Sequence, residues 1–208
     1  MVESQVRPNK VTDPAIIEAM LAVPRERFVP PSLRGIAYVD EDIPLGGGRY
    51  LMEPMVLARL LQTAAIRPSD VVLDVGCGSG YASAVLALLA RDVVALEEDP
   101  ALMRQAAVLV TELGLPTVAV VEGKLAAGCP ARAPYDVILF NGAVAAIPPV
   151  IAQQLADGGR LLAVVQADGA MGKAVLMTRV DDVFGQRIVF DAATPLLPGF
   201  AAQPGFVF

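Results

Sequence analysis

Residues 74–80 are the part of the sequence whose residue types and spacing indicate chemistry. Asp74 precedes three glycines, at positions 76, 78 and 80, and an acid, Glu97, follows 23 positions after Asp74. Glycines let the backbone approach a ligand closely and adopt a positive φ. A carboxylate at the end of the next strand accepts two hydrogen bonds from a ribose diol. The glycines and Glu97 together therefore predict a site for a ligand that contains a nucleoside.

The spacing of the glycines distinguishes between nucleotides. In the dinucleotide-binding pattern G-x-G-x-x-G the third glycine comes one residue later than Gly80, and Asp74 would repel a pyrophosphate. A P-loop is excluded because no Gly-Lys-Ser/Thr follows the glycines. S-adenosylmethionine carries an ammonium, a sulfonium and a ribose but no phosphate, so it suits an acid before the loop. The pattern D-x-G-x-G-x-G followed by an acid at a strand end resembles class I methyltransferases.

The same residues have a plainer interpretation, as a tight strand-to-helix turn with an N-terminal cap. Three spaced glycines combined with two acids disfavour that interpretation. Cys77 is interpreted as a small loop residue, and Cys129 has no visible partner or activating histidine, so we expect both thiols to be unreactive.

The composition excludes several other chemistries. The chain has 208 residues and no histidine, which removes Ser-His triads, histidine bases and histidine-ligated metals. Two cysteines are too few for a zinc site or a disulfide framework, so we expect no metal. A net charge of −6 provides no general basic footprint for a nucleic acid. The most apolar stretch, 81–90, is too short to cross a bilayer, and the first residues lack signal-peptide features. We expect a cytoplasmic protein without a membrane partner.

The glycine loop needs a strand before it and a helix after it, and the surrounding pattern supplies both. Short apolar runs predict buried strands, at 71–75, 93–96, 118–121, 136–140 and 161–165. Capping residues and helical spacing predict helices, from Pro14 to before Pro24, from Pro54, over 81–90, from Asp99 and Pro100 to about 113, and over 150–155. The residues 30–48 are predicted to be mostly loop, and 174–179 with 186–190 a closing hairpin.

Strands that alternate with helices indicate a largely parallel α/β sheet. The predicted fold is a Rossmann-like, doubly wound sheet of the class I methyltransferase type. It carries an N-terminal helical segment and a C-terminal antiparallel hairpin. We expect one domain over 1–208, made of a helical and substrate-loop segment (1–66), a cofactor-binding core (67–167) and C-terminal strands (168–208).

The flanking segments resemble one family in particular, the protein-L-isoaspartate O-methyltransferases. The resemblance covers roughly residues 1–165, and more weakly Pro195 and Leu196. The segments that carry it are V-P-R-E-R-F-V-P (23–30), A-Y-V-D (37–40), I-P-L-G (43–46), A-P-Y-D (133–136) and Q-L-A-D-G-G-R-L (154–161). The glycine loop is common to many methyltransferases, so the N-terminal segment is what specifies this family.

The resemblance implies methyl transfer from S-adenosylmethionine to the carboxylate of L-isoaspartyl residues in damaged proteins, which would be the partners of this chain. That chemistry tolerates the absence of histidine, because a carboxylate is already ionised at pH 7 and is itself the nucleophile. The implied cofactor-binding residues are Asp74, Gly76, Cys77, Gly78, Ser79, Gly80, Glu97, Lys124 and Leu125. The implied acceptor-binding residues are Tyr50, Leu51 and Met52, of which Met52 stands at the family's catalytic Ser/Thr position.

Two departures from the family pattern keep alternatives open. The family's loop Gly-Gln-Thr-Ile-Ser-x-Pro reads G-R-Y-L-M-E-P here, so Met52 replaces the hydroxyl that contacts the reacting carboxylate, and Glu53 stands beside it. Arg49 or Tyr50 is an alternative donor. Lys124 replaces the aspartate that accepts from the adenine amino group, and a lysine cannot accept a hydrogen bond. The alternatives are a same-fold methyltransferase with another acceptor and a non-catalytic S-adenosylmethionine-binding protein, with nucleotide-dependent oxidoreduction a distant fourth interpretation.

Overall fold

The computed structural model describes residues 1–167 and 170–201. The part of the predicted C-terminal segment at 168–169 and 202–208 lies outside the described residues. The helices are α1 (Pro14–Ala22), α2 (Pro54–Ala64), α3 (Tyr81–Ala87), α4 (Pro100–Glu112) and α5 (Pro149–Ala152). The strands are β1 (Ile43–Gly46), β2 (Arg49–Leu51), β3 (Val71–Val75), β4 (Asp92–Glu97), β5 (Val118–Glu122), β6 (Tyr135–Val144), β7 (Leu155–Val165), β8 (Lys173–Val180) and β9 (Val183–Asp191).

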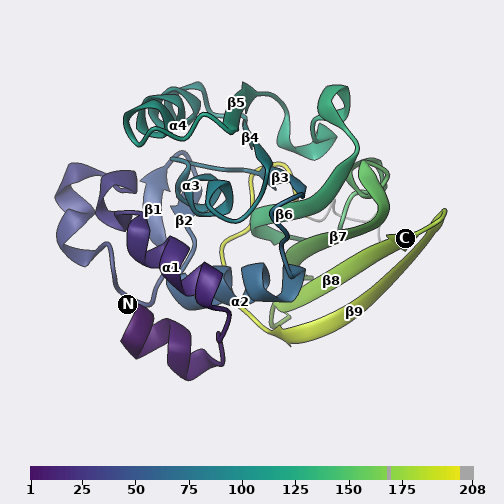
Figure 1. Cartoon of the computed structure of the whole chain (residues 1–208), viewed down its shortest axis with the longest axis horizontal. Coiled ribbons are helices and arrows are strands. Elements are labelled where there is room, and N and C mark those ends of the chain that lie inside the picture. Colours follow the sequence, from purple (N-terminus) through teal and green to yellow (C-terminus); the bar gives the residue numbers. More distant parts are fainter. Residues whose placement is uncertain (168–169, 202–208) are drawn as a thin grey trace, which may run out of the picture.

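One sheet organises the molecule (Figure 1), with the strand order β5-β4-β3-β6-β7-β8-β9 among the described residues. The strands from β5 to β7 pair in parallel, and β8 is antiparallel to both of its neighbours. The chain moves outward from β3 to β5 and then returns to β6 on the other side of β3. The predicted Rossmann-like sheet with a C-terminal antiparallel hairpin is confirmed.

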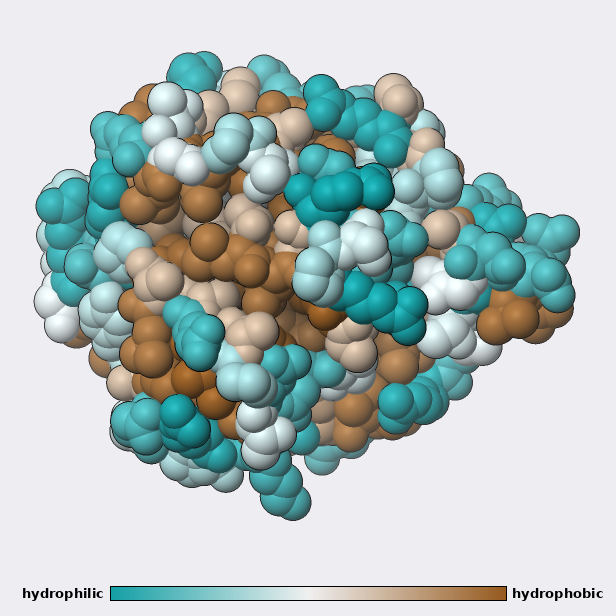
Figure 2. All heavy atoms as spheres, in the orientation of Figure 1, coloured by the Kyte–Doolittle hydropathy of each residue, from teal (hydrophilic) through white to brown (hydrophobic). Residues whose placement is uncertain are grey.

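The two faces of the sheet bury different sets of side chains. Successive residues of a strand point to opposite faces, and in β3 Val72 packs with helices α1 to α4 while Leu73 and Val75 pack on the other side. That second side is covered by α5, by Leu125 and by the C-terminal residues Leu197 and Phe200. In the same orientation as Figure 1, Figure 2 shows a central apolar area on the helix-bearing face, with polar side chains around it.

The helix starts follow the capping chemistry read from the sequence. Asp13, rather than Thr12, caps α1 by accepting a hydrogen bond from the Ala15 amide at 2.9 Å. Asp99 caps α4 by accepting from the amides of Ala101 and Leu102 at 2.7 and 3.1 Å. These caps fix where α1 begins and where the chain turns from β4 into α4, next to Glu97.

Several predicted boundaries are wrong, and for the strands the reason is pairing with a partner strand. The α3 helix ends at residue 87 instead of 90, and α5 covers 149–152 instead of 150–155. The β7 strand begins at Leu155 instead of 161, because Leu155 pairs with Tyr135 of β6 although the residues after it show no apolar alternation. The region 30–48, predicted to be mostly loop, contains β1, which pairs with β2 through the glycines at 46–48.

Within the described residues, no helix is both long enough and apolar enough to cross a membrane. The same residues contain no group of three or more Cys, Asp or Glu side chains placed to hold a metal ion.

Candidate functional site

The candidate site lies where the sheet reverses its strand order, at the carboxyl ends of β3, β4 and β6. Parallel α/β sheets bind their ligands in this crevice. The loop 76–80 leaves β3 there, Glu97 ends β4, and Asn141 follows Phe140 in β6. The structure therefore brings together the glycine loop and the acid that are 23 positions apart in the sequence.

The backbone amides of the glycine loop are already hydrogen bonded within the chain. The amides of Gly76 and Cys77 both donate to the Leu96 carbonyl, at 2.9 and 3.0 Å. The amide of Gly78 donates to Oε2 of Glu97 at 2.7 Å, and that of Gly80 donates to the Cys77 carbonyl. A phosphate-binding loop needs such amides to point at the ligand. This loop instead suits a ligand without phosphate.

Positive φ values explain why glycine is needed in the loop. Gly76, Gly78 and Gly80 have φ values of 78°, 58° and 95°. Only glycine adopts this region at no steric cost. The turn directs the Gly78 amide toward Glu97 and starts α3 directly after Gly80.

Glu97 is the most heavily hydrogen-bonded acid of the site. Its side chain is 1% exposed. Oε1 accepts from the amides of Glu98 and Asp99 at 2.9 and 3.1 Å, and Oε2 accepts from Gly78. These bonds fix the carboxylate at the end of β4, where an acceptor for a ribose diol was predicted.

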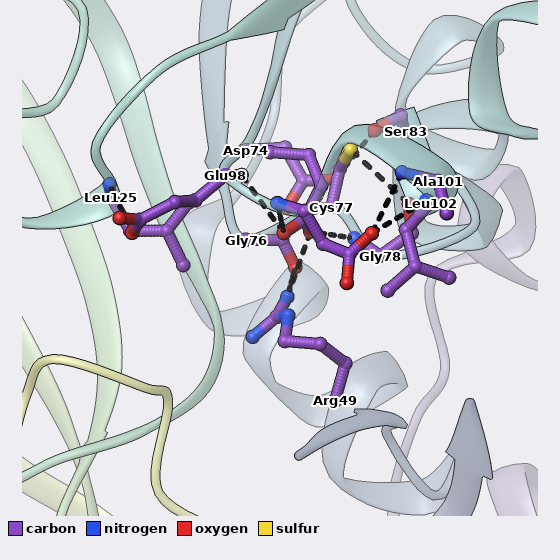
Figure 3. A network of polar contacts seen from close by, with 12 residues as sticks. Arg49, Asp74, Gly76, Cys77, Gly78, Ser83, Glu98, Ala101, Leu102 and Leu125 are labelled. Carbon is purple, nitrogen blue, oxygen red and sulfur yellow. Dashed lines mark hydrogen bonds and ion pairs between the residues drawn. The ribbon is translucent and has the colours of Figure 1, made fainter. Parts of the chain in front are cut away.

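Arg49 also reaches this carboxylate. Its Nη2 atom lies 3.1 Å from Oε2 of Glu97 and donates to the Gly76 carbonyl, and its side chain is 3% exposed. Arg49 begins β2, so the β1–β2 hairpin carries the guanidinium into the crevice (Figure 3). The pair is fully desolvated, and removal of either partner would leave an uncompensated charge in the interior.

Asp74 lies at the base of the crevice, within β3. The Ser83 hydroxyl donates to its Oδ2 at 2.6 Å, and its Oδ1 has no hydrogen-bond partner among the described residues. Burial, with a smaller contribution from the charge of Glu97, raises the pKa of Asp74 to about 7 against the opposing effects of Ser83 and Arg49. The crevice thus holds an acid with an unpaired oxygen, suited to a cationic group.

The raised pKa of Asp74 predicts a pH dependence of stability. Between about pH 4 and pH 7 the folded chain keeps a proton that the unfolded chain, with its ordinary pKa of 3.8, has released. Raising the pH through this range is therefore expected to lower the free energy of unfolding. The upper bound is roughly 4 kcal/mol, at 1.36 kcal/mol per pKa unit.

Urea unfolding of the wild type and of Asp74→Asn at several pH values measures this dependence. Asparagine has no proton to lose, so the variant should show a flatter profile. Glu53, whose pKa is also raised to about 7 by burial, contributes equally to both proteins and cancels in the difference. Identical slopes in the two proteins would contradict the assignment to Asp74.

The predicted acceptor loop places its three residues differently. Tyr50 is 37% exposed, whereas Leu51 and Met52 are buried. The Met52 carbonyl accepts from Nη2 of the buried Arg25 at 2.7 Å, which fixes the backbone of the loop. The structure therefore has a buried, apolar side chain at the position where the family's hydroxyl is expected.

Acidic residues gather beside this loop. The Asp42 carboxylate accepts from the Glu53 amide at 3.0 Å and from the Thr194 hydroxyl at 3.1 Å. Burial, together with the charges of Asp42, Asp40 and Glu41, raises the pKa of Glu53 to about 7. Glu53 therefore takes up a proton at a higher pH than an ordinary glutamate, and in its neutral form it repels an anionic acceptor less.

The remaining predicted cofactor residues differ in what they offer. Lys124 is exposed, whereas Leu125 is buried and its amide donates to Oε2 of Glu98 at 3.3 Å. The Ser79 hydroxyl donates to the Phe28 carbonyl at 2.5 Å, which ties the N-terminal segment to the loop. Cys77 is buried, and burial raises the pKa of its thiol, which disfavours the reactive thiolate form.

Two residues of the site carried no interpretable signal in the sequence. Arg25 was visible only as part of the segment 23–30, and the structure shows that its guanidinium binds the carbonyls of Ala37 and Met52. Leu197 comes from the C-terminal part of the chain, and its Cδ2 lies against the backbone of Gly76 and Gly142. Both are contacts between distant segments, which local patterns do not encode.

The sheet order, the glycine loop after β3 and the buried acid that ends β4 define a class I methyltransferase fold. Residues 1–190 match the family model described as Protein-L-isoaspartate(D-aspartate) O-methyltransferase. The chain belongs to this family.

Individual relatives agree with the family match. The chain is 37% identical over 199 residues to a Protein-L-isoaspartate O-methyltransferase 1 of Rhodopseudomonas palustris (strain HaA2), covering 95% of this chain and 81% of that protein. It is 41% identical over 187 residues to a Protein-L-isoaspartate O-methyltransferase of Methylorubrum extorquens (strain PA1), covering 90% and 82%.

Solved structures agree on the fold. A protein-L-isoaspartate O-methyltransferase superposes with a TM-score of 0.82 at 25% identity, covering 94% of this chain and 64% of that one. A Plasmodium falciparum protein of the same description, solved with S-adenosyl-L-homocysteine, has a TM-score of 0.79 at 18% identity, covering 92% and 94%. The latter likeness shows the fold alone.

The residues of the crevice fit S-adenosylmethionine in their chemistry. Glu97 supplies the buried acceptor that a ribose diol needs, and the unpaired Oδ1 of Asp74 suits a cationic group. In this conformation, however, Arg49 and Leu197 lie against the loop in front of Glu97. The hydrogen-bonding groups that S-adenosylmethionine needs are therefore present. The space in front of Glu97, where the ligand would lie, is filled by side chains of the protein.

Proposed function

We propose that this chain transfers the methyl group of S-adenosylmethionine to the side-chain carboxylate of L-isoaspartyl residues in damaged proteins. Membership of the family over residues 1–190 carries this proposal. The glycine loop and Glu97 support it, because they form a nucleoside crevice without a phosphate cradle. The isoaspartyl-containing protein is thus the partner of the chain.

The cofactor would be held by residues from three strand ends. Glu97 would accept from the ribose diol, the loop 76–80 would allow close approach of the methionine part, and Asp74 would face its ammonium group. The Leu125 amide would be the donor to the adenine ring, in place of its 3.3 Å bond to Oε2 of Glu98, since the Lys124 side chain offers no acceptor. When bound, S-adenosylmethionine supplies a methyl group that is activated by the sulfonium charge.

The chain does not need a general base for this reaction. An isoaspartyl carboxylate is ionised at pH 7, and its oxygen forms the new bond to the methyl carbon as the carbon–sulfur bond breaks. The electron pair of that bond stays on sulfur, so no proton moves and the products are a methyl ester and S-adenosylhomocysteine. The residues of the acceptor loop act by alignment, which can lower a barrier by about 7–11 kcal/mol at best.

Both cysteines of the chain are free and buried. Reduced thiols are typical of a reducing compartment. A cytoplasmic location is accordingly part of this proposal.

A second candidate function is methyl transfer to a different acceptor. The buried Met52, in place of a hydroxyl, favours a less polar acceptor than a carboxylate. The acids around Glu53 also favour an uncharged or cationic group over an anion.

A methyl-transfer assay distinguishes the two functions. Transfer of labelled methyl from S-adenosylmethionine to an isoaspartyl peptide is expected, with the matching aspartyl peptide as the control. Transfer to neither peptide, with the cofactor shown to be bound, would contradict the repair function and support the second candidate.

A further inference from the structure

The space in front of Glu97 is filled by side chains of the chain itself. A Cβ atom built on Gly76 would lie 2.7 Å from Nη2 of Arg49 and 3.1 Å from Cδ2 of Leu197. One built on Gly78 would lie 3.0 Å from Cδ1 of Leu45. The surface of the glycine loop that a ligand would approach is therefore covered by the β1–β2 hairpin and by the C-terminal segment.

Arg49 uses the oxygen that a ribose needs. Oε1 of Glu97 already accepts from two backbone amides, and Oε2 accepts from the Gly78 amide and from Nη2 of Arg49. A carboxylate has about four acceptor positions, so all of them are in use. A ribose diol, which donates its hydroxyl hydrogens, can bind Glu97 only if Arg49 leaves.

Arg49 is held in the crevice by its side chain, whereas Leu197 is held by its backbone. Ile43 and Leu51 anchor the β1–β2 hairpin in the core, so the guanidinium of Arg49 is the part that can leave. Leu197 is held by two backbone bonds around Ala143, whose amide donates to the Pro195 carbonyl and whose carbonyl accepts from the Leu197 amide. Nε of Arg49 has no partner within the described residues, so that buried donor gains a hydrogen bond when the side chain reaches water.

We propose that Arg49 closes the crevice in the cofactor-free protein and competes with the ribose diol for Glu97, a regulatory contact that rests on the proposed function. Binding then requires the Arg49 side chain to withdraw its guanidinium from Glu97. The cofactor then binds less tightly than it would to an open crevice, because the Arg49–Glu97 pair must break first. The apparent affinity is reduced in proportion to the fraction of the protein that is open.

Calorimetry with S-adenosylhomocysteine tests the competition. The proteins are the wild type, Arg49→Gln, which removes the charge, and Arg187→Gln as the matched control. Arg187 is exposed on β9, at the far edge of the sheet from β3. We expect Arg49→Gln to bind at least tenfold more tightly than the wild type and Arg187→Gln to bind like the wild type. Equal, measurable affinities in all three would overturn the competition and leave the proposed function intact.

Thermal unfolding without ligand provides a readout that does not depend on binding. Arg49→Gln and Glu97→Gln are each expected to lower the melting temperature, and the double variant by less than the sum of the two. Strictly additive effects would overturn the closed pair. Absence of binding in the wild type and in every variant, including Arg49→Gln, would overturn the competition and the proposed function together, a pattern different from equal, measurable affinities.

Discussion

Replacing Glu97 with alanine is expected to lower the free energy of unfolding by about 3–5 kcal/mol, because Arg49 is left as an unpaired buried charge. The substitution also removes the acceptor for three backbone amides, those of Gly78, Glu98 and Asp99. We further expect at least tenfold weaker binding of S-adenosylmethionine, about 1.4 kcal/mol. Urea unfolding and calorimetry measure the two effects.

Glu98→Ala is the matched control for this prediction. Glu98 is the neighbouring acid, but it is exposed and accepts only a long bond, of 3.3 Å, from the Leu125 amide. Its loss should change stability by less than about 0.5 kcal/mol, as is usual for surface substitutions. If the two alanine variants were equally stable, the buried pair would contribute nothing and the assignment of Glu97 would be wrong.

Replacing Met52 with serine is expected to raise methyl transfer to an isoaspartyl peptide by about 10- to 150-fold. A hydrogen bond to a charged group contributes about 1.5–3 kcal/mol, and each 1.36 kcal/mol is tenfold in rate. The same change should lower the free energy of unfolding by about 2–5 kcal/mol, because Met52 is 1% exposed and its removal leaves a cavity. Initial rates at saturating cofactor, below the melting temperature of the variant, give the comparison.

Met52→Ala separates the effect of the hydroxyl from the effect of the space. Alanine creates nearly the same cavity and offers no donor. An increase with serine alone would assign the deficit to the missing hydrogen bond. Equal increases with serine and alanine would contradict that explanation and show that the bulk of Met52 excludes the acceptor.

The fold was predictable because its signals are local. The β3 strand over 71–75 agrees with the predicted range, since a continuous apolar run bounded by Asp70 and Gly76 leaves little choice. The caps at Asp13 and Asp99 were predictable for the same reason, because a cap is made within three residues. The start of β7 and the hairpin of β1 with β2 were not, because both depend on a partner strand.

The candidate site was predictable in part. Glu97 was found from its spacing to Asp74, and the structure places its carboxylate on the amide of Gly78. The sequence showed that the acceptor loop departs from the family pattern, because Met52 stands in place of a hydroxyl. It gave no indication that Arg49 reaches Glu97. The two residues are 48 positions apart, and no spacing rule connects a hairpin to a strand end.

The sequence by itself determined the class of fold and the family, and it predicted the nucleoside crevice, because periodicity, glycine spacing and short motifs are local features of the chain. Only the tertiary structure decided that the crevice is closed by Arg49 and Leu197 and that Asp74 is buried with an unpaired oxygen. Burial and ion pairing depend on which distant segments meet. These tertiary contacts determine the free-energy difference between the closed and the open crevice.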